Sequence, residues 1–296
     1  MKQKQPKAGL VCLCGLFGYT RQAFYQQRTR NFHQAVKEEV IIEKVREKRK
    51  GMPRLGARKL LWLLKKDGIK LGRDKFFEIL RHNGMLVKKR KHRIFTTQSK
   101  HWLTKYPNLI EGLEVLKPNK LWVADITYIL VEPDFAYLFL ITDAYSKKVL
   151  GHTLSRTLEA TGGIEALKTA LSQVDWKDRV GIIHHSDRGV QYCSYAYVEL
   201  LTNSKMLISM THGDPYENPV AERINGTFKT EWIYDERYTC YDNARERIAQ
   251  IIDLYNAARP HMSCNMLTPD EAHKCTGRLK KHWKNYRRWN PVQTGI

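Results

Sequence analysis

The chain has 296 residues, with 51 Lys and Arg against 30 Asp and Glu. This length is enough for about two domains with a sizeable core. It contains no run of about 18 apolar residues, and its N-terminus is too interrupted for a convincing signal peptide, so we expect a soluble intracellular protein without a membrane span. The six cysteines form no CxxC pair, which favours reduced structural thiols over a zinc site.

The formal charge of +21 is unevenly distributed along the chain. Residues 1–105 hold 28 basic and 7 acidic side chains, and residues 274–296 hold seven basic side chains and no acidic one. The middle, 106–273, holds 16 basic and 23 acidic side chains. We interpret the flanks as polyanion-binding and the centre as a region that needs carboxylates. The alternative is that basic ends only improve solubility.

The basic first third predicts short amphipathic helices. Residues 1–35 form a helix-turn-helix-like segment in which Thr20 is the candidate N-cap of the second helix. Residues 36–105 predict a basic helix-turn-helix DNA-binding domain and linker, in which three helices are followed by the basic segment 88–105. The last of these helices would enter the major groove. A protein-binding bundle has the same three-helix pattern, and the basic charge favours DNA.

The central region contains runs rich in β-branched and aromatic residues. Residues 121–131, 137–145 and 147–154 predict an antiparallel meander. Helices at 159–173, 195–203 and 218–233 then alternate with strands at 180–186 and 205–210. This order predicts an α/β, RNase H-like mixed five-strand sheet with flanking helices over 106–273, preceded by the all-α helix-turn-helix region. Residues 274–296 are a basic C-terminal tail, either a DNA-contacting segment or a disordered end.

Three carboxylates fall where this fold would bring them together. Asp125 is in the middle of the first strand, Asp187 ends the fourth strand, and Glu222 is in the first two turns of the last helix. An unpaired ionised Asp on a buried strand costs several kcal/mol, roughly, so Asp125 needs a counter-ion. If the first and fourth strands are neighbours, the three acids converge and suit a hard divalent cation. Other acids fall at turns, where capping is the expected role: Asp134, Asp143 and Asp214.

Five ordered stretches resemble a known family. They are "WVADITYI", "ITDAYSKKVLGHTL", "HHSDRGVQYCS", "GDPYENPVAERINGTFKTE" and "LYNAARPHMSCNMLTPDEA". They are similar to the integrase-core transposases of bacterial insertion sequences, OrfB type, whose Asp-Asp-Glu triad is shared with retroviral integrases. The resemblance covers nearly the whole chain and implies that Asp125, Asp187 and Glu222 are the catalytic and metal-binding triad. The 34 residues between Asp187 and Glu222 are about one fewer than the commonest family pattern.

The resemblance also implies the chemistry. Two Mg²⁺ ions, for which Mn²⁺ can substitute, would lie about 3.5 to 4 Å apart and assist DNA cleavage and strand transfer at the element's ends. Lys229, seven positions after Glu222, matches the basic residue that follows the glutamate in this family and would meet a DNA phosphate. The further candidate DNA contacts are Arg188, Gln191, Tyr192 and Asn218. We expect His184 and His185 to support the site or to pack structurally.

The expected partners are terminal inverted repeats and target DNA. We also expect a homo-oligomer on DNA, a cytoplasmic, nucleoid-associated location in a bacterium, and a contribution from an upstream first-frame product, since this chain has no sustained heptad repeat. Two other functions stay open: a catalytically incomplete accessory or repressor subunit of the same element, and an RNase H-like nuclease or resolvase. A His185–Ser186 hydrolase pair is disfavoured because adjacent strand residues point to opposite faces.

Overall fold

A computed structural model describes residues 9–88, 90, 102–212 and 217–283. The chain forms two compact units, of which one comprises Met1–Gly51 with Gly56–Val87 and the other Met52–Leu55 with Lys88–Ile296. Parts of three expected segments lie outside the described residues: the first eight residues, most of the linker before residue 105, and the tail from residue 284. Each unit is considered by itself below.

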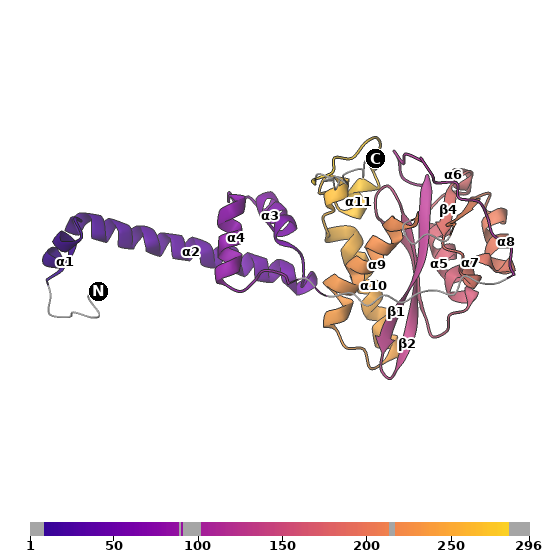
Figure 1. Cartoon of the computed structure of the whole chain (residues 1–296), viewed down its shortest axis with the longest axis horizontal. Coiled ribbons are helices and arrows are strands. Elements are labelled where there is room, and N and C mark those ends of the chain that lie inside the picture. The colour runs from indigo at the N-terminus through magenta and orange to yellow at the C-terminus, as the bar shows by residue number, and fades with distance from the viewer. Residues whose placement is uncertain (1–8, 89, 91–101, 213–216, 284–296) are drawn as a thin grey trace, which may run out of the picture. The chain divides into compact units, whose positions relative to one another are not determined.

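The described part of the first unit is entirely helical. Its helices are α1 (Leu10–Leu16), α2 (Arg21–Gly51), α3 (Ala57–Lys66) and α4 (Arg73–His82) (Figure 1). Two of the helices expected in residues 36–105 are therefore present as α3 and α4, and ion pairs of Asp67 with Lys48 and of Lys75 with Glu38 connect them to the C-terminal part of α2. Thr20 Oγ1 accepts a hydrogen bond from the Ala23 amide at 3.0 Å, as expected of an N-cap.

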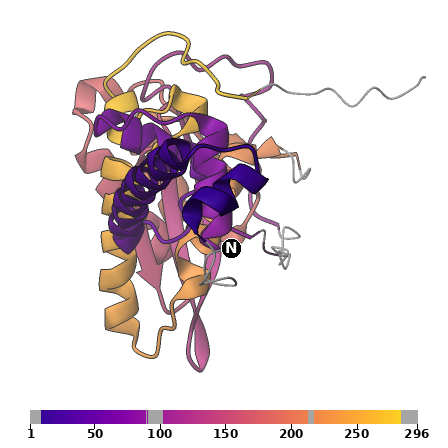
Figure 2. The ribbon, with the colours of Figure 1, turned by 90° about the vertical axis from the view of Figure 1, so that its left-hand side faces the viewer.

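The long helix α2 differs from the expected division of the chain. It continues through residues 35 and 36, where we expected one segment to end and the next to begin (Figure 2 views α2 nearly along its axis). The helix contains no proline, and its one glycine is the last residue. Side-chain hydrogen bonds from Gln27 to Asn31 and from Gln34 to Glu38, each four residues apart, further support its continuity.

The second unit contains a five-stranded mixed sheet. Its strands are β1 (Leu121–Val131), β2 (Asp134–Asp143), β3 (Val149–Ser155), β4 (Ile183–Ser186) and β5 (Leu207–Met210), in the order β3-β2-β1-β4-β5. The pairs β1–β2 and β2–β3 are antiparallel, whereas β1–β4 and β4–β5 are parallel. The RNase H-like fold predicted from the order of elements is confirmed, and β1 and β4 are neighbours.

The helices of this unit cover both faces of the sheet. They are α5 (Ala160–Ser172), α6 (Trp176–Arg179), α7 (Val190–Cys193), α8 (Tyr195–Asn203), α9 (Pro219–Glu231), α10 (Tyr241–Ala258) and α11 (Pro269–Ala272), with 3-10 turns η2 (Ile233–Asp235) and η3 (Met262–Cys264). No element had been assigned to the region of α10 from the sequence. None of the helices in the described parts of the chain is long and apolar enough to cross a membrane.

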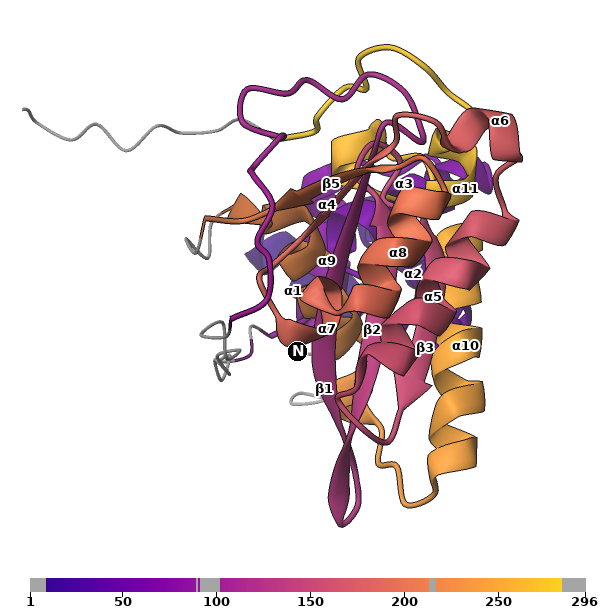
Figure 3. The same ribbon diagram turned by 90° about the vertical axis from the view of Figure 1, so that its right-hand side faces the viewer.

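Alternation along β1 decides which face each side chain joins. Trp122 and Ala124 lie in a core cluster with residues of α5, α7 and α8, the helices in front of the strands in Figure 3. Leu121 and Val123 lie in a second cluster that contains Ala221 of α9. Asp125 follows the alternation of Leu121 and Val123, so its side chain belongs to the face that α9 covers.

Close packing of β3 against α5 gives a stability prediction. A Cβ on Gly151 would lie 2.0 Å from the carbonyl oxygen of Ala166 and 2.8 Å from the amide nitrogen of Ala170, both backbone atoms. Gly151→Ala should therefore lower the free energy of unfolding by about 3 kcal/mol or more, measured by urea denaturation.

Gly226→Ala is the matched control. Nothing lies within 4 Å of a Cβ at this position inside α9, so the change should raise the free energy of unfolding by about 0.5 to 1 kcal/mol. Equal effects of the two substitutions would contradict the described contact between β3 and α5.

Candidate active site

The parallel pairing of β1 with β4 brings two of the candidate acids together. The partners are Leu121 with Ile183, Trp122 with His184 and Val123 with His185, a constant offset of 62 positions. Extending this register by two residues places Asp187, just beyond β4, beside Asp125 of β1. The two carboxylates, far apart in sequence, are thus neighbours because of strand register.

Asp125 is a half-buried carboxylate with two hydrogen-bond donors. Its Oδ1 accepts from the Ile126 amide at 2.9 Å, and its Oδ2 accepts from Asn225 Nδ2 at 2.6 Å. Burial, followed by repulsion from Asp187, raises the pKa of Asp125 from 3.8 to about 7, despite the opposing effect of these donors. A nearby cation would remove much of the cost of ionising Asp125.

Asp187 lies in a tight turn that depends on a glycine. Its Oδ1 accepts a hydrogen bond from the Gly189 amide at 3.0 Å. A Cβ on Gly189 would lie 3.0 Å from the same carboxylate oxygen and 3.0 Å from Gln191 Oε1. A side chain at position 189 would therefore disturb the orientation of the Asp187 carboxylate.

Helix α9 presents a row of polar side chains to β1. Asn218, Glu222, Asn225 and Lys229 follow one another at spacings of four, three and four residues, which places them on one helical face. Asn218 Nδ2 donates to the Ala124 carbonyl at 3.1 Å, and Asn225 bonds to Asp125 as described above. Because Glu222 lies between these two anchored residues, it is on the side of α9 that faces the aspartates.

The side chain of Glu222 is more exposed to solvent than those of the two aspartates. Its side chain is exposed, and partial loss of water raises its pKa above the ordinary value. Among the residues that the structure describes, no three His, Cys, Asp or Glu side chains are gathered closely enough to hold one metal ion. The structure thus brings Asp125 and Asp187 together and places Glu222 on the same side, but not in a three-carboxylate cluster.

The donor set nevertheless fits a hard divalent cation. All three candidates offer carboxylate oxygens, the ligands that Mg²⁺ and Mn²⁺ prefer. Burial and the neighbouring Asp187 raise the pKa of Asp125, so the nearby hydrogen-bond donors do not fully compensate a second negative charge. A cation between these groups would compensate that charge.

Lys229 is the basic side chain of the same helix face. It is partly buried, and loss of water lowers its pKa, while the negative charge of Asp125 acts in the opposite direction. It is therefore close enough to the acids to compensate part of their charge.

The other expected DNA contacts lie in different surroundings. Tyr192 is 2% exposed and packs against His184 and Tyr197, with ring centroids 6.3 and 5.4 Å away. Asn218 is buried and tied to β1, so neither side chain is a surface group in this structure. Gln191 Nε2 donates to the Leu158 carbonyl at 2.8 Å, and Arg188 Nη2 lies 3.2 Å from His212 Nδ1.

The histidine pair before Asp187 makes buried contacts that suit structural packing, one of the two roles expected for it. His184 Nε2 lies 2.9 Å from the Tyr197 hydroxyl, and His185 Nδ1 lies 2.9 Å from Ser209 Oγ. Burial lowers the pKa of His184 to about 3 and that of His185 to about 4, so both rings are neutral near pH 7. Ser186 Oγ bonds to the Asp187 carbonyl, which agrees with rejecting a hydrolase pair.

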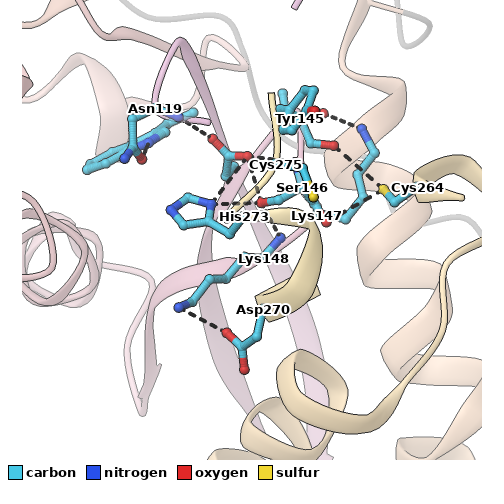
Figure 4. A network of polar contacts seen from close by, with 12 residues as sticks. Asn119, Tyr145, Ser146, Lys147, Lys148, Cys264, Asp270, His273 and Cys275 are labelled. Atoms are coloured by element: carbon cyan, nitrogen blue, oxygen red, sulfur yellow. Dashed lines mark hydrogen bonds and ion pairs between the residues drawn. The ribbon is translucent and has the colours of Figure 1, made fainter. Parts of the chain in front are cut away.

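Asp143 shows what a capping aspartate looks like in the same fold. It is fully buried at the end of β2 and accepts hydrogen bonds from the Asn119 amide and from both the amide and hydroxyl of Ser146. The Ser146 hydroxyl also contacts His273 Nδ1 at 3.0 Å (Figure 4). Unlike Asp125, Asp143 has a lowered pKa, because His273, followed by Ser146 and Asn119, outweighs the effect of its burial.

Sequence reasoning missed Asn225 and the role of Gly189 beside Asp187. Asn225 is three residues after Glu222 and four before Lys229, so the predicted helix already placed it on their face. Helical periodicity applied to every polar residue of that helix would have found it. The hydrogen bond to Asp125, in contrast, required the tertiary structure.

Comparisons with known proteins identify the family to which this fold belongs. The integrase core domain family matches residues 116–215, and a second integrase core domain family matches residues 205–269. A 31 kDa protein of the insertion element IS600 from Shigella sonnei is 30% identical over 268 residues, covering 87% of this chain and 96% of the relative.

Two further relatives are named as transposases. A putative transposase of IS986/IS6110 from Mycobacterium tuberculosis is 31% identical over 225 residues, covering 73% of this chain and 80% of the relative. Transposase InsF of IS3A from Escherichia coli is 28% identical over 284 residues, covering 92% and 96%. The chain belongs to the bacterial insertion-sequence transposases with an integrase core. These findings support transposase function and do not favour the accessory or repressor alternative.

The raised pKa of Asp125 predicts a pH-dependent effect on stability without divalent ions. The folded protein holds this proton more tightly than the unfolded chain, so the stabilising contribution is present at low pH and is lost as pH rises from about 4 through about 7. Asp125→Asn should therefore stabilise the protein at pH 8, on the order of 2 kcal/mol, and the advantage should shrink towards pH 5.

Thermal denaturation in EDTA at several pH values measures this difference. Asp134→Asn, which changes an exposed carboxylate at the start of β2, is the control and should show no such trend. If the difference in stability between wild type and Asp125→Asn does not change with pH, ionisation of Asp125 does not destabilise the folded protein.

Proposed function

We propose that this transposase is a divalent-metal-dependent polynucleotidyl transferase whose catalytic residues are Asp125, Asp187 and Glu222. The observation that supports this most directly is the register of β1 and β4, which places Asp187 beside Asp125. The polar row on α9, anchored by Asn218 and Asn225, adds Glu222 to the same side. We expect two Mg²⁺ ions, with Mn²⁺ as a substitute, and these three carboxylates as their protein ligands.

Bound divalent ions would polarise the phosphodiester and lower the pKa of a bound water or hydroxyl. The chain's own residues prepare the site for them. Asn225 and the Ile126 amide orient the Asp125 carboxylate, and the Gly189 amide orients that of Asp187. Lys229 offers a positive charge to the DNA phosphate next to the acids.

The proposed reaction has two phosphoryl transfers. In cleavage, a water oxygen bonds to phosphorus while the bond from phosphorus to the 3′ oxygen breaks, which leaves a 3′-OH on the element's end. In strand transfer, this 3′ oxygen bonds to a target phosphorus while a target 3′ oxygen leaves and takes up a proton. Cleavage hydrolyses one phosphodiester with water. In strand transfer, one phosphodiester is made for the one broken, so this step needs no external energy source and no covalent protein intermediate.

The proposed DNA substrates are the terminal inverted repeats of the element and its target DNA. Residues 1–105 would hold the ends, because they account for the basic excess of the chain. We propose residues 1–35, 36–105, 106–273 and 274–296 as functional segments, of which the first two share the continuous helix α2. We also propose assembly as a homo-oligomer on DNA, nucleoid association and a contribution from an upstream first-frame product. Arg188 and Gln191 remain proposed DNA contacts beside Asp187.

Hydrogen bonds connect the beginning of the basic tail to the rest of the second unit. The Gly277 amide donates to the Leu116 carbonyl at 2.7 Å, and the Tyr145 hydroxyl donates to the Gly277 carbonyl at 2.9 Å. The His282 amide donates to the Met262 carbonyl at 2.9 Å. Lys280 and Lys281 lie between these hydrogen-bonded residues, so their backbone positions are fixed. We propose that they contact DNA phosphates.

Loss of the Asp187 carboxylate should abolish the chemistry but spare DNA binding. Asp187→Asn should lower Mg²⁺-dependent cleavage and strand transfer of labelled end DNA by more than about 100-fold, since even partners one step removed from a metal contribute about 10- to 100-fold. End binding, measured by mobility shift in EDTA, should stay within about twofold. Undiminished strand transfer by this variant would refute the assigned site, and an inactive but tightly binding wild type would favour an accessory subunit.

Loss of Lys229 should act mainly through phosphate contact. Lys229→Ala should weaken binding of DNA ends and reduce the slope of log K against log salt concentration by about 1, because one fewer phosphate is neutralised. Lys168→Ala, on the exposed side of α5 at the other face of the sheet, is the control and should leave the slope unchanged. An unchanged slope for Lys229→Ala would remove this lysine from the DNA interface.

A further inference from the structure

The C-terminal end of α9 is held by a buried ion pair outside the proposed catalytic residues. Arg259, just after α10, makes two hydrogen bonds to the carboxylate of Glu231, the last residue of α9, at 2.7 and 2.6 Å. The side chains of Arg259 and Glu231 are only 5% and 15% exposed. A two-point pair of this kind fixes geometry as well as charge, and a lysine cannot reproduce it.

Further contacts hold the Arg259 guanidinium in place. Its Nη1 lies 2.8 Å from His261 Nε2, and its central carbon is 5.6 Å from the centroid of the Tyr255 ring. The Tyr255 ring also packs against Phe228 of α9, with centroids 4.7 Å apart. We call Glu231, Arg259 and His261 the α9 clamp.

The clamp is attached to the sheet through α10. Asn256, three residues before Arg259, forms two hydrogen bonds to the backbone of Val149 in β3. Its Oδ1 accepts from the Val149 amide at 3.0 Å, and its Nδ2 donates to the Val149 carbonyl at 2.9 Å. The Tyr255 hydroxyl donates to the Lys147 carbonyl at 2.9 Å. The position of Arg259 is therefore set by β3 and the turn before it.

The clamp and the polar row hold opposite sides of α9. Glu231 is nine residues after Glu222, so at 100° per residue the two lie about half a turn apart around the helix axis and roughly 13 Å apart along it. Asn218 and Asn225 attach the side of Glu222 to β1, and Arg259 attaches the side of Glu231 to α10. Attachments on opposite sides restrain the rotation of the helix about its own axis.

We propose that Arg259 is a positioning residue that, through Glu231, sets the rotation of α9 and thereby the placement of Glu222 and Asn225 against Asp125. It acts on the reaction without touching DNA or metal. Its effect on catalysis rests on the proposed function of the acids, but its effect on α9 does not. In this proposal, the segment "NAARPH" at 256–261 positions α9 and does not itself bind metal or DNA.

The test uses full-length Arg259→Lys with a matched control. Arg247→Lys changes an arginine of the same helix α10 that also makes a two-point pair, to Glu236 at 2.6 to 3.0 Å, but not with α9. Both variants keep the positive charge and lose the two-point geometry. Each would be compared with wild type in three measurements on the same preparations.

The first measurement is hydrogen–deuterium exchange without metal or DNA. Amides of 220–231 should exchange at least about tenfold faster in Arg259→Lys than in wild type, and at the wild-type rate in Arg247→Lys. Amides of β2 and β4 should be unchanged in both variants, which excludes general unfolding. Wild-type exchange rates across 220–231 in Arg259→Lys would overturn the proposal.

The second and third measurements are Mn²⁺-dependent cleavage of end DNA and end binding in EDTA. Arg259→Lys should lower the cleavage rate, or raise the Mn²⁺ concentration for half-maximal rate, by about 10- to 100-fold, while end binding stays within about twofold. Equal losses in cleavage and binding, or equal losses in both variants, would show a merely structural role and overturn the proposal.

The outcomes separate the two proposals. If wild type does not cleave end DNA with either metal, the proposed function fails, whereas the exchange measurement still decides whether Arg259 sets α9. If wild type cleaves and Arg259→Lys cleaves equally well, the positioning proposal fails and the proposed function stands.

Discussion

The proximity of the half-buried Asp125 to Asp187 is the constraint on which the proposed site depends. Parallel pairing of β1 with β4 forces the two carboxylates together, and burial raises the cost of ionising them. The neighbouring groups reduce this cost without removing it. Asn225 and the Gly189 amide donate hydrogen bonds to the carboxylates, and Lys229 adds a positive charge nearby. The remaining negative charge fits the divalent cations that we propose at this site.

Helix α9 links this acid pair to the remainder of the fold. One side of the helix carries Glu222, Asn225 and Lys229 towards β1, and the opposite side ends at the pair of Glu231 with Arg259. The site that we propose therefore depends on contacts beyond the three acids. A helix that presents a glutamate to two strand aspartates needs a fixed rotation, and we attribute this rotation to the hydrogen bonds at its two ends.

Much of the architecture was predictable because it follows local rules. The β-branched run at 121–131 gave β1, and Asp125, Asp187 and Glu222 fell at the positions where an RNase H-like order of elements would gather them. Predictions about individual contacts were less reliable. Tyr192 and Asn218 looked like surface groups beside an acid motif, yet both are buried, since alternation and helix spacing do not reveal which face a neighbouring element covers.

The sequence by itself determined the types of element, the basic and acidic regions, the family and the identity of the candidate acids. These depend on residue type, periodicity and order along the chain. Only the tertiary structure decided that Asp187 is beside Asp125, that Asn225 bonds to Asp125, and that Arg259 holds Glu231. The reason is physical: strand register and helix rotation are fixed by contacts between residues distant in sequence, and a pattern within one segment carries no information about them.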